Sequence, residues 1–163
     1  MIIAGTGHRP QFAEVGKLKA FSNEQSIAMT QTAKKHLQEL GASYVISGGA
    51  LGWDTALARA AYSLKIPYAV YVPCWGHGSM WTQEQQVTYR ALLEYADKWH
   101  YVVEEPYASQ HMITRDHAMV NDCDSLLALW SGMKKGGTFK TIQYAKQQGK
   151  NVVNVWSDYE ATA

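Results

Sequence analysis

The chain has 163 residues, a hydrophobic fraction of 47% and a formal net charge of +1. Typical domains contain about 100–150 residues, so we expect one domain over residues 1–163. The near-neutral charge argues against nucleic acid as a partner, because non-specific binding along a phosphate backbone needs a basic stripe. No apolar run reaches 18 residues, so no segment is expected to cross a membrane.

The two cysteines, Cys74 and Cys123, lie far apart in the sequence and form no C-x-x-C motif. A disulfide framework is therefore not expected, and a cytoplasmic location is the better prediction. Residues 1–5 are apolar but too few for the hydrophobic region of a signal peptide. Cys74 and His77 have the spacing of half a zinc site, but no second pair accompanies them, so neither a metal nor another cofactor is expected.

Short apolar segments alternate with longer amphipathic segments along the chain. Six short segments fit buried strands, which are rich in Val, Ile and aromatic residues: 1–5, 43–47, 68–72, 99–103, 125–130 and 151–156. Five segments between them fit helices: approximately 24–40, 53–64, 82–96, 111–122 and 138–148. The 53–64 helix is the clearest, because its Ala and Leu residues recur on one face. Gly41 and Gly149 follow two of the helices, where a left-handed C-cap is expected.

This alternation predicts a Rossmann-like α/β fold with a doubly wound, mostly parallel sheet and helices on both faces. In such sheets, ligands bind beyond the carboxyl ends of the strands, near the point where the strand order reverses. The longest irregular connections, 6–23 and 73–81, are therefore of interest, since long loops in compact domains are more often functional.

Glycine-rich loops follow three of the predicted strands. The first loop is Gly5-Thr6-Gly7-His8-Arg9-Pro10, in which glycine allows close approach of the backbone and Arg9 can pair with phosphate. The second is Ser47-Gly48-Gly49-Ala50-Leu51-Gly52-Trp53-Asp54, which runs into a helix and directs free N–H groups at an anion. Two simpler explanations stay open: the first loop is a tight turn, and Asp54 satisfies the helix dipole.

The third loop contains Ser131-Gly132 and then Gly136-Gly137-Thr138, which open the next helix and form a second candidate anion site. Neither a Walker A motif nor a complete G-x-G-x-x-G is present, so an ATPase or an ordinary NAD dehydrogenase is not supported. Three glycine loops at corresponding strand ends together predict a nucleotide pocket. Lys134 and Lys135 either attract phosphate or are simply solvated.

Two tryptophans and one histidine each have two possible interpretations. Trp75 or Trp81 in the 73–81 loop either stacks on a base or anchors the loop against the core. His8 is either a hydrogen-bond donor or a general acid, because its ordinary pKa permits both.

The first two loops, with the Arg115…Asp124…Gly136-Gly137-Thr138 block, resemble the SMF/DprA–LOG (SLOG) superfamily in its YspA/YpsA-like branch. The resemblance spans nearly the whole chain. It implies a Rossmann-like fold, a homodimer or higher homo-oligomer, and binding of nucleotides, nucleotide sugars or ADP-ribose-like molecules. It also implies a phosphate-clamping role for Arg115 in the helix before the fifth strand.

Some members of the superfamily, the Lonely Guy phosphoribohydrolases, cleave the N-glycosidic bond of nucleoside 5′-monophosphates. Their pattern is an Arg on a helix followed by P-G-G-x-G-T-x-x-E. Arg115 matches the Arg and Gly137-Thr138 match the Gly-Thr, but Thr141 occupies the Glu position and the leading Pro-Gly-Gly is absent. Because glycosidic cleavage requires an acid, a base or a stabilising charge, this departure favours a binding protein over a hydrolase. Asp54, Asp116 and Glu84 are possible substitutes for the missing carboxylate.

The sequence therefore predicts binding of a phosphorylated nucleotide or nucleotide-derived small molecule at the strand ends. The alternative is an N-glycosidase that acts on nucleoside 5′-monophosphates, with Arg115 and Asp54 as catalytic residues. A DNA-processing accessory role is the third possibility, which the near-neutral charge disfavours. The expected ligand-binding residues are Thr6, Gly7, His8, Arg9, Ser47, Gly48, Gly49, Gly52, Trp53, Asp54, Gly132, Gly136, Gly137 and Thr138.

Overall fold

A computed structural model of the chain describes residues 1–10 and 20–162. Its centre is a six-stranded, entirely parallel sheet with the order β4-β3-β2-β1-β5-β6. The strands are β1 (Ile2–Gly7), β2 (Tyr44–Ser47), β3 (Tyr68–Val72), β4 (Lys98–Tyr101), β5 (Ser125–Leu129) and β6 (Asn151–Asn154). The predicted doubly wound α/β fold is confirmed.

The strand order reverses beside β1. From β1 the chain moves outward through β2 and β3 to β4, then crosses back to place β5 on the other side of β1. The register aligns Thr6 of β1 with Ala128 and Gly7 with Leu129, so both strands end at the same edge of the sheet. Ligands of open parallel sheets bind at such a reversal.

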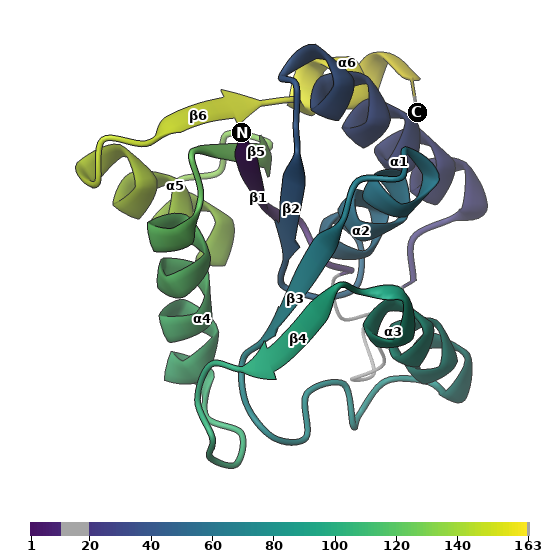
Figure 1. The fold of residues 1–163 in the computed structure, drawn as a ribbon, viewed down its shortest axis with the longest axis vertical. Coiled ribbons are helices and arrows are strands. Elements are labelled where there is room, and N and C mark those ends of the chain that lie inside the picture. The colour runs from purple at the N-terminus through teal and green to yellow at the C-terminus, as the bar shows by residue number, and fades with distance from the viewer. Residues whose placement is uncertain (11–19, 163) are drawn as a thin grey trace.

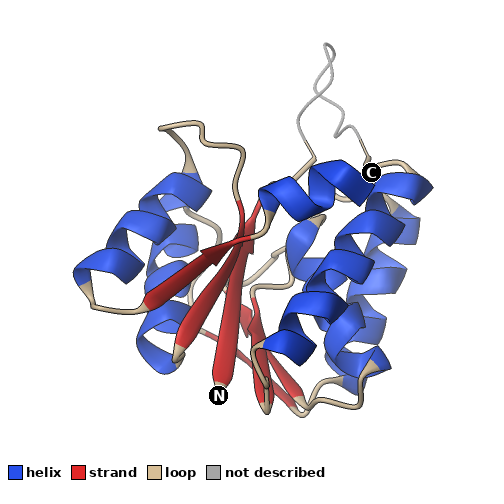
Figure 2. Ribbon diagram, turned by 90° about the horizontal axis from the view of Figure 1, so that it is seen from above, coloured by secondary structure: helices blue, strands red, loops and turns tan. Residues whose placement is uncertain are grey.

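Helices cover both faces of the sheet, as Figures 1 and 2 show. On one face lie α1 (Asn23–Glu39), α2 (Trp53–Ser63), α3 (Gln83–Tyr95) and the short α6 (Trp156–Thr162). On the other face lie α4 (Ser109–Asp122) and α5 (Gly137–Gln147). This arrangement leaves the ends of β1 and β5 between the starts of α2, α4 and α5.

Alternate strand residues build two separate cores, because successive side chains in a strand point to opposite faces. Ile3 packs with the α1–α2 side, whereas its neighbour Ala4 packs with the α4–α5 side. In β5, Leu127 belongs to the first core, whereas Leu126 belongs to the second.

The helix ends differ in how they are capped. Ser22 and Thr82 form capping boxes that close the starts of α1 and α3. Gly41 (φ 64°) and Gly149 (φ 71°) follow α1 and α5 in the left-handed region, as predicted. By contrast, α2 and α5 begin after glycines that provide no side-chain cap.

Some predicted boundaries are wrong. The sixth strand ends at Asn154 rather than residue 156, because the Asn154 Oδ1 accepts the backbone N–H of Trp156 (3.2 Å) and α6 begins there. The first strand continues through Gly7, since pairing with β5 extends it. Most of the predicted 6–23 loop, residues 11–19, lies outside the described residues. Within the described part of the chain, no helix has both the length and the apolar character needed to cross a membrane.

Candidate functional site

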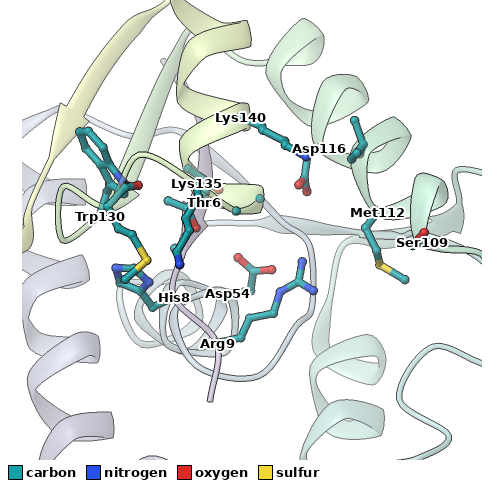
Figure 3. Close-up of a pocket in the computed structure, with 17 residues that line it drawn as sticks. Thr6, His8, Arg9, Asp54, Ser109, Met112, Asp116, Trp130, Lys135 and Lys140 are labelled. Atoms are coloured by element: carbon teal, nitrogen blue, oxygen red, sulfur yellow. Dashed lines mark hydrogen bonds between the residues drawn. The ribbon is translucent and has the colours of Figure 1, made fainter. Parts of the chain in front are cut away.

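A cavity of about 420 Å³ opens at the carboxyl ends of β1 and β5, where the strand order reverses. Its floor is formed by residues 5–9, which end β1 and begin the following loop. Asp54 of α2 and a stripe on α4 form one side, and residues between 130 and 140 form the other (Figure 3). Ligand pockets are commonly about 300–1,000 Å³, so this space suits a small molecule.

The start of α5 lies open on this cavity. Its N-cap, Gly136, makes no side-chain hydrogen bond, and Gly136 and Gly137 are both exposed to solvent. The first N–H groups of a helix have no partner within the helix, and the helix dipole makes this end positive. Lys135 and Lys140 line the cavity beside this helix start (Figure 3). The third glycine loop therefore has the geometry that the sequence predicts for binding an anion.

The second glycine loop lies against protein atoms instead of the cavity. A Cβ on Gly48 would lie 2.5 Å from Nη1 of Arg115 and 2.7 Å from Oδ2 of Asp54. A Cβ on Gly52 would lie 2.6 Å from the carbonyl oxygen of His8, which accepts the backbone N–H of Trp53 at 3.4 Å. The start of α2 is therefore already covered by the chain.

Most of the predicted residues of this loop lie outside the cavity lining. Ser47, Gly48 and Gly49 are buried, and the fully buried Trp53 donates its indole N–H to the carbonyl of Leu127 (3.2 Å). Gly52 lines a second cavity of about 440 Å³ among α1, α2 and α3.

Asp54 is the member of the second loop that reaches the cavity. Its side chain is largely buried, with 8% of the residue exposed, and its Oδ2 accepts the N–H of Ala50 at 3.2 Å. Burial raises the pKa of Asp54 above its ordinary value, although the positive charges of Arg115 and Arg9 oppose this shift. Figure 3 shows its carboxylate pointing into the cavity beside the Arg9 side chain.

Asp116 is a second carboxylate on the same cavity. Its Oδ1 accepts the Nε–H of Arg115 at 2.8 Å, and its Oδ2 lies 3.2 Å from the hydroxyl of Thr141. The residue at the Glu position of the hydrolase pattern is thus in contact with a carboxylate supplied by α4.

Arg115 is fully buried and does not line the cavity. Its Nη1 donates to the carbonyl oxygens of Gly48 (2.5 Å) and Tyr71 (3.2 Å), so it joins the ends of β2 and β3. The same guanidinium positions Asp116. Through these contacts Arg115 links the strand ends to α4.

The remaining predicted residues divide between the cavity and other surfaces. Thr6, Gly7, His8 and Thr138 line the cavity, whereas Gly132 is exposed and does not. Trp81 lines the second cavity, and Trp75 is 47% exposed and lines neither cavity.

Several lining residues were not predicted from the sequence. Ser109, Met112 and Ile113 form a stripe on α4 together with Asp116, which was predicted only as a possible substitute carboxylate, and their spacing of one to four residues along one helix face is the signal that identifies the stripe. Trp130 and Met133 are further lining residues. Their place on the cavity depends on the path of the loop between β5 and α5, which has no sequence period.

Among residues 1–10 and 20–162, no group of three or more His, Cys, Asp and Glu side chains is arranged to hold a metal ion. The absence of a metal therefore stays a prediction. Cys74 and Cys123 are both buried and unpaired.

Comparison with known proteins identifies the family. A model described as the YspA SLOG family matches residues 6–157, nearly the whole chain. The chain belongs to the YspA SLOG family. This membership confirms the resemblance derived from the glycine loops.

Two sets of proteins illustrate the relationship. UPF0398 proteins from Bacillus anthracis (strain A0248) and Bacillus cereus (strain B4264) are each 24% identical over 162 residues, which cover 91% of this chain and 84% of the relative. DNA processing protein A from Helicobacter pylori, a single-stranded DNA-binding protein, has a similar fold, with a TM-score of 0.64 and 17% identity. That match covers 93% of this chain and 63% of the other, so this chain spans less than two thirds of that protein.

The structural genomics target TM1055 is also similar, with a TM-score of 0.59, 15% identity and coverage of 93% of this chain and 71% of that one. At such identities these structures show a shared fold.

Proposed function

We propose that this SLOG-family protein binds a phosphorylated, nucleotide-derived small molecule, such as a nucleoside monophosphate or an ADP-ribose-like compound. The site is the cavity at the carboxyl ends of β1 and β5. The observation that carries the proposal is the uncapped, exposed start of α5 on this cavity, flanked by Lys135 and Lys140. Free N–H groups, a positive helix end and two ammonium groups together favour a phosphate.

The cavity also suits the remainder of such a ligand. Its other walls combine apolar side chains, including Met112, Ile113 and Trp130, with the carboxylates of Asp54 and Asp116. Apolar walls can contact a base, and carboxylates can accept hydrogen bonds from ribose hydroxyls. We therefore place the phosphate at α5 and the sugar across the two carboxylates.

A thermal-shift panel of AMP, ADP-ribose, NAD and cyclic nucleotides tests the proposal, with inorganic phosphate as a separate arm. Ligand at about 100 times its Kd should add about 2.7 kcal/mol of stability. Mass spectrometry of small molecules released from the purified protein provides an independent measurement. If no compound raises the melting temperature at millimolar concentration and none co-purifies, the proposal is wrong.

A second candidate function is hydrolysis of the N-glycosidic bond of a nucleoside 5′-monophosphate. It is favoured by Asp54 and Asp116, two carboxylates in different environments on one cavity. Asp116 is paired with Arg115, whereas burial raises the pKa of Asp54, and such unequal pairs suit one base and one acid. Under this hypothesis, Asp116 of α4 supplies the carboxylate that is missing at Thr141.

Chromatographic detection of free base distinguishes hydrolysis from binding alone. Wild-type protein should release base from AMP, and Asp54→Asn and Asp116→Asn should release less while retaining bound nucleotide. A wild-type preparation that leaves every nucleotide intact would exclude hydrolysis without affecting the binding proposal.

Three broader expectations remain proposals. The family resemblance supports a homodimer or higher homo-oligomer, which light scattering after size-exclusion chromatography would detect. The two unpaired cysteines support a reducing compartment such as the cytoplasm. The net charge of +1 argues against a DNA-processing role, and the absence of single-strand binding at low salt would agree with that.

A further inference from the structure

The loop between β5 and α5, residues 131–136, forms one wall of the cavity. Its residues are exposed, and two of them, Lys135 and Gly136, bring the anion site to the cavity. Gly132 (φ 95°) and Gly136 (φ 92°) have left-handed conformations, and a Cβ at either position would meet no atom within 4 Å. The position of this loop therefore depends on hydrogen bonds more than on packing.

Hydrogen bonds hold the beginning of the loop. The Asn154 side chain accepts the N–H of Trp130 (3.1 Å) and donates to its carbonyl (3.0 Å). The Trp130 indole N–H donates to the carbonyl of Met133 at 2.9 Å. His8 provides a further anchor, because its Nε2 accepts the backbone N–H of Ser131 at 3.0 Å. Of these three side chains, only His8 changes its charge near neutral pH.

The surroundings of His8 favour its neutral form. Burial lowers the pKa of His8, and the Trp156 ring of α6 packs edge-to-face with it, with 5.3 Å between centroids. An imidazole that accepts through Nε2 carries its proton on Nδ1. The charged groups that share the cavity with His8 come from its own loop, α2, α4, the 131–136 loop and α5: Arg9, Asp54, Asp116, Lys135 and Lys140. On α6, Asp158 is paired with Lys35 and His36 of α1.

We propose that His8 is a positioning residue whose neutral imidazole holds the 131–136 loop over the anion site, and whose protonation releases the loop and weakens ligand binding. A protonated Nε2 presents an N–H to the N–H of Ser131, so two donors face each other and the hydrogen bond is lost. Release of Ser131 removes one of the hydrogen bonds that position the segment that carries Lys135 and Gly136. This inference rests on the proposed binding of a phosphorylated ligand at that site.

The direction of the effect separates this role from simple charge attraction. A protonated His8 that touched the phosphate would tighten binding as the pH falls. A His8 that acts through the loop predicts weaker binding as the pH falls. The two roles therefore give opposite pH profiles.

The first experiment uses the ligand-free protein, so that it remains informative if the proposed ligand class is wrong. In ¹H–¹⁵N NMR spectra recorded from pH 7.5 to pH 5, the Ser131 amide resonance should titrate together with the His8 ring. In His8→Gln, whose side-chain oxygen accepts a hydrogen bond and does not titrate, the Ser131 amide should keep a constant position. A Ser131 amide that is unaffected while the His8 ring titrates would overturn the proposal.

The second experiment measures the Kd for AMP at pH 7.5 and pH 5 by calorimetry. Relative to His8→Gln, which experiences the same titration of the AMP phosphate, wild-type protein should lose about three- to tenfold in affinity, the effect of one hydrogen bond. His8→Ala should bind weakly at both pH values. His117→Gln is the matched control: His117 stacks on Tyr144 at 3.7 Å outside the cavity lining, so this variant should keep the wild-type profile.

Equal pH ratios for wild-type protein and His8→Gln, or tighter wild-type binding at pH 5, would contradict the loop mechanism. Absence of AMP binding in every variant would instead contradict the proposed ligand, and the NMR result would still decide the role of His8. If His8→Gln does not fold, His8→Asn provides a second non-titrating acceptor.

Discussion

The two glycine loops that precede α2 and α5 look alike in the sequence but serve different purposes in the structure. The loop before α2 is closed: Gly48 lies against Arg115 and Asp54, and Gly52 lies against the carbonyl of His8. The loop before α5 is open: Gly136 and Gly137 are exposed, and a Cβ at either position would meet no atom within 4 Å. Glycine before a helix therefore accompanies close approach of atoms in one loop and an exposed, open backbone in the other.

This difference also changes how the arginine of the family pattern is interpreted. Arg115 contacts the closed loop through the Gly48 carbonyl, whereas Lys135 and Lys140 stand beside the open loop. We therefore expect changes at the closed loop to affect stability and changes at the open loop to affect ligand binding.

The largest expected effect is that of Arg115→Ala. Removing the buried guanidinium leaves Asp116 and two carbonyl oxygens without this partner, and loss of one member of a buried pair costs about 3–5 kcal/mol. Urea unfolding should show this loss. Arg90→Ala on the exposed surface of α3 is the control and should change stability by less than about 0.5 kcal/mol. An unchanged free energy of unfolding in Arg115→Ala would show that these buried contacts contribute little to stability.

The next effect compares the glycines directly. Gly48→Ala should lower the free energy of unfolding by about 1–3 kcal/mol, because its Cβ would overlap Arg115 and Asp54. Gly137→Ala should leave stability unchanged or raise it by up to about 1 kcal/mol, since the site is open and alanine favours helix. Equal losses in the two variants, measured by the same denaturant titration, would remove the distinction between the loops.

A smaller effect is expected on ligand affinity. Lys135→Ala combined with Lys140→Ala should raise the Kd for AMP about tenfold, as the loss of two exposed charge interactions near a helix start predicts. The melting temperature without ligand should stay close to that of the wild type. Lys146→Ala, in the last turn of the same helix, is the matched control and should bind AMP normally. A similar loss in the control would indicate a general charge effect instead of a local site.

The smallest effect concerns Asp54 and pH. Because burial raises the pKa of this carboxyl in the folded state, the folded protein loses stability as the pH rises from the ordinary carboxyl value through the raised pKa. Asp54→Asn removes this cost and retains an oxygen that can accept the Ala50 N–H. In thermal melts, the melting temperature of Asp54→Asn relative to the wild type should therefore be higher at pH 7 than at pH 4. A difference in melting temperature that is the same at both pH values would argue against ionisation of Asp54 as the cause.

The order of the six strands and the five longer helices, the parallel sheet and the sheet edge that carries the glycine loops were all predictable from the sequence. Hydrophobic runs and helical periodicity are local, so they are readable without a structure. The C-cap glycines Gly41 and Gly149 were predictable for the same reason. The α6 helix was missed because its seven residues, Trp156–Thr162, are too few to show a helical period.

Which glycine loop remained open, and which polar residues came into contact, depended on how the chain packs in three dimensions. Trp53 turned inward to the carbonyl of Leu127, 74 positions away in the chain, and Arg115 reached Gly48 across 67 positions. Asp116 gained its place beside Thr141 because α4 and α5 pack side by side on one face of the sheet. Such contacts depend on where distant segments meet in space, and local spacing carries no information about that meeting.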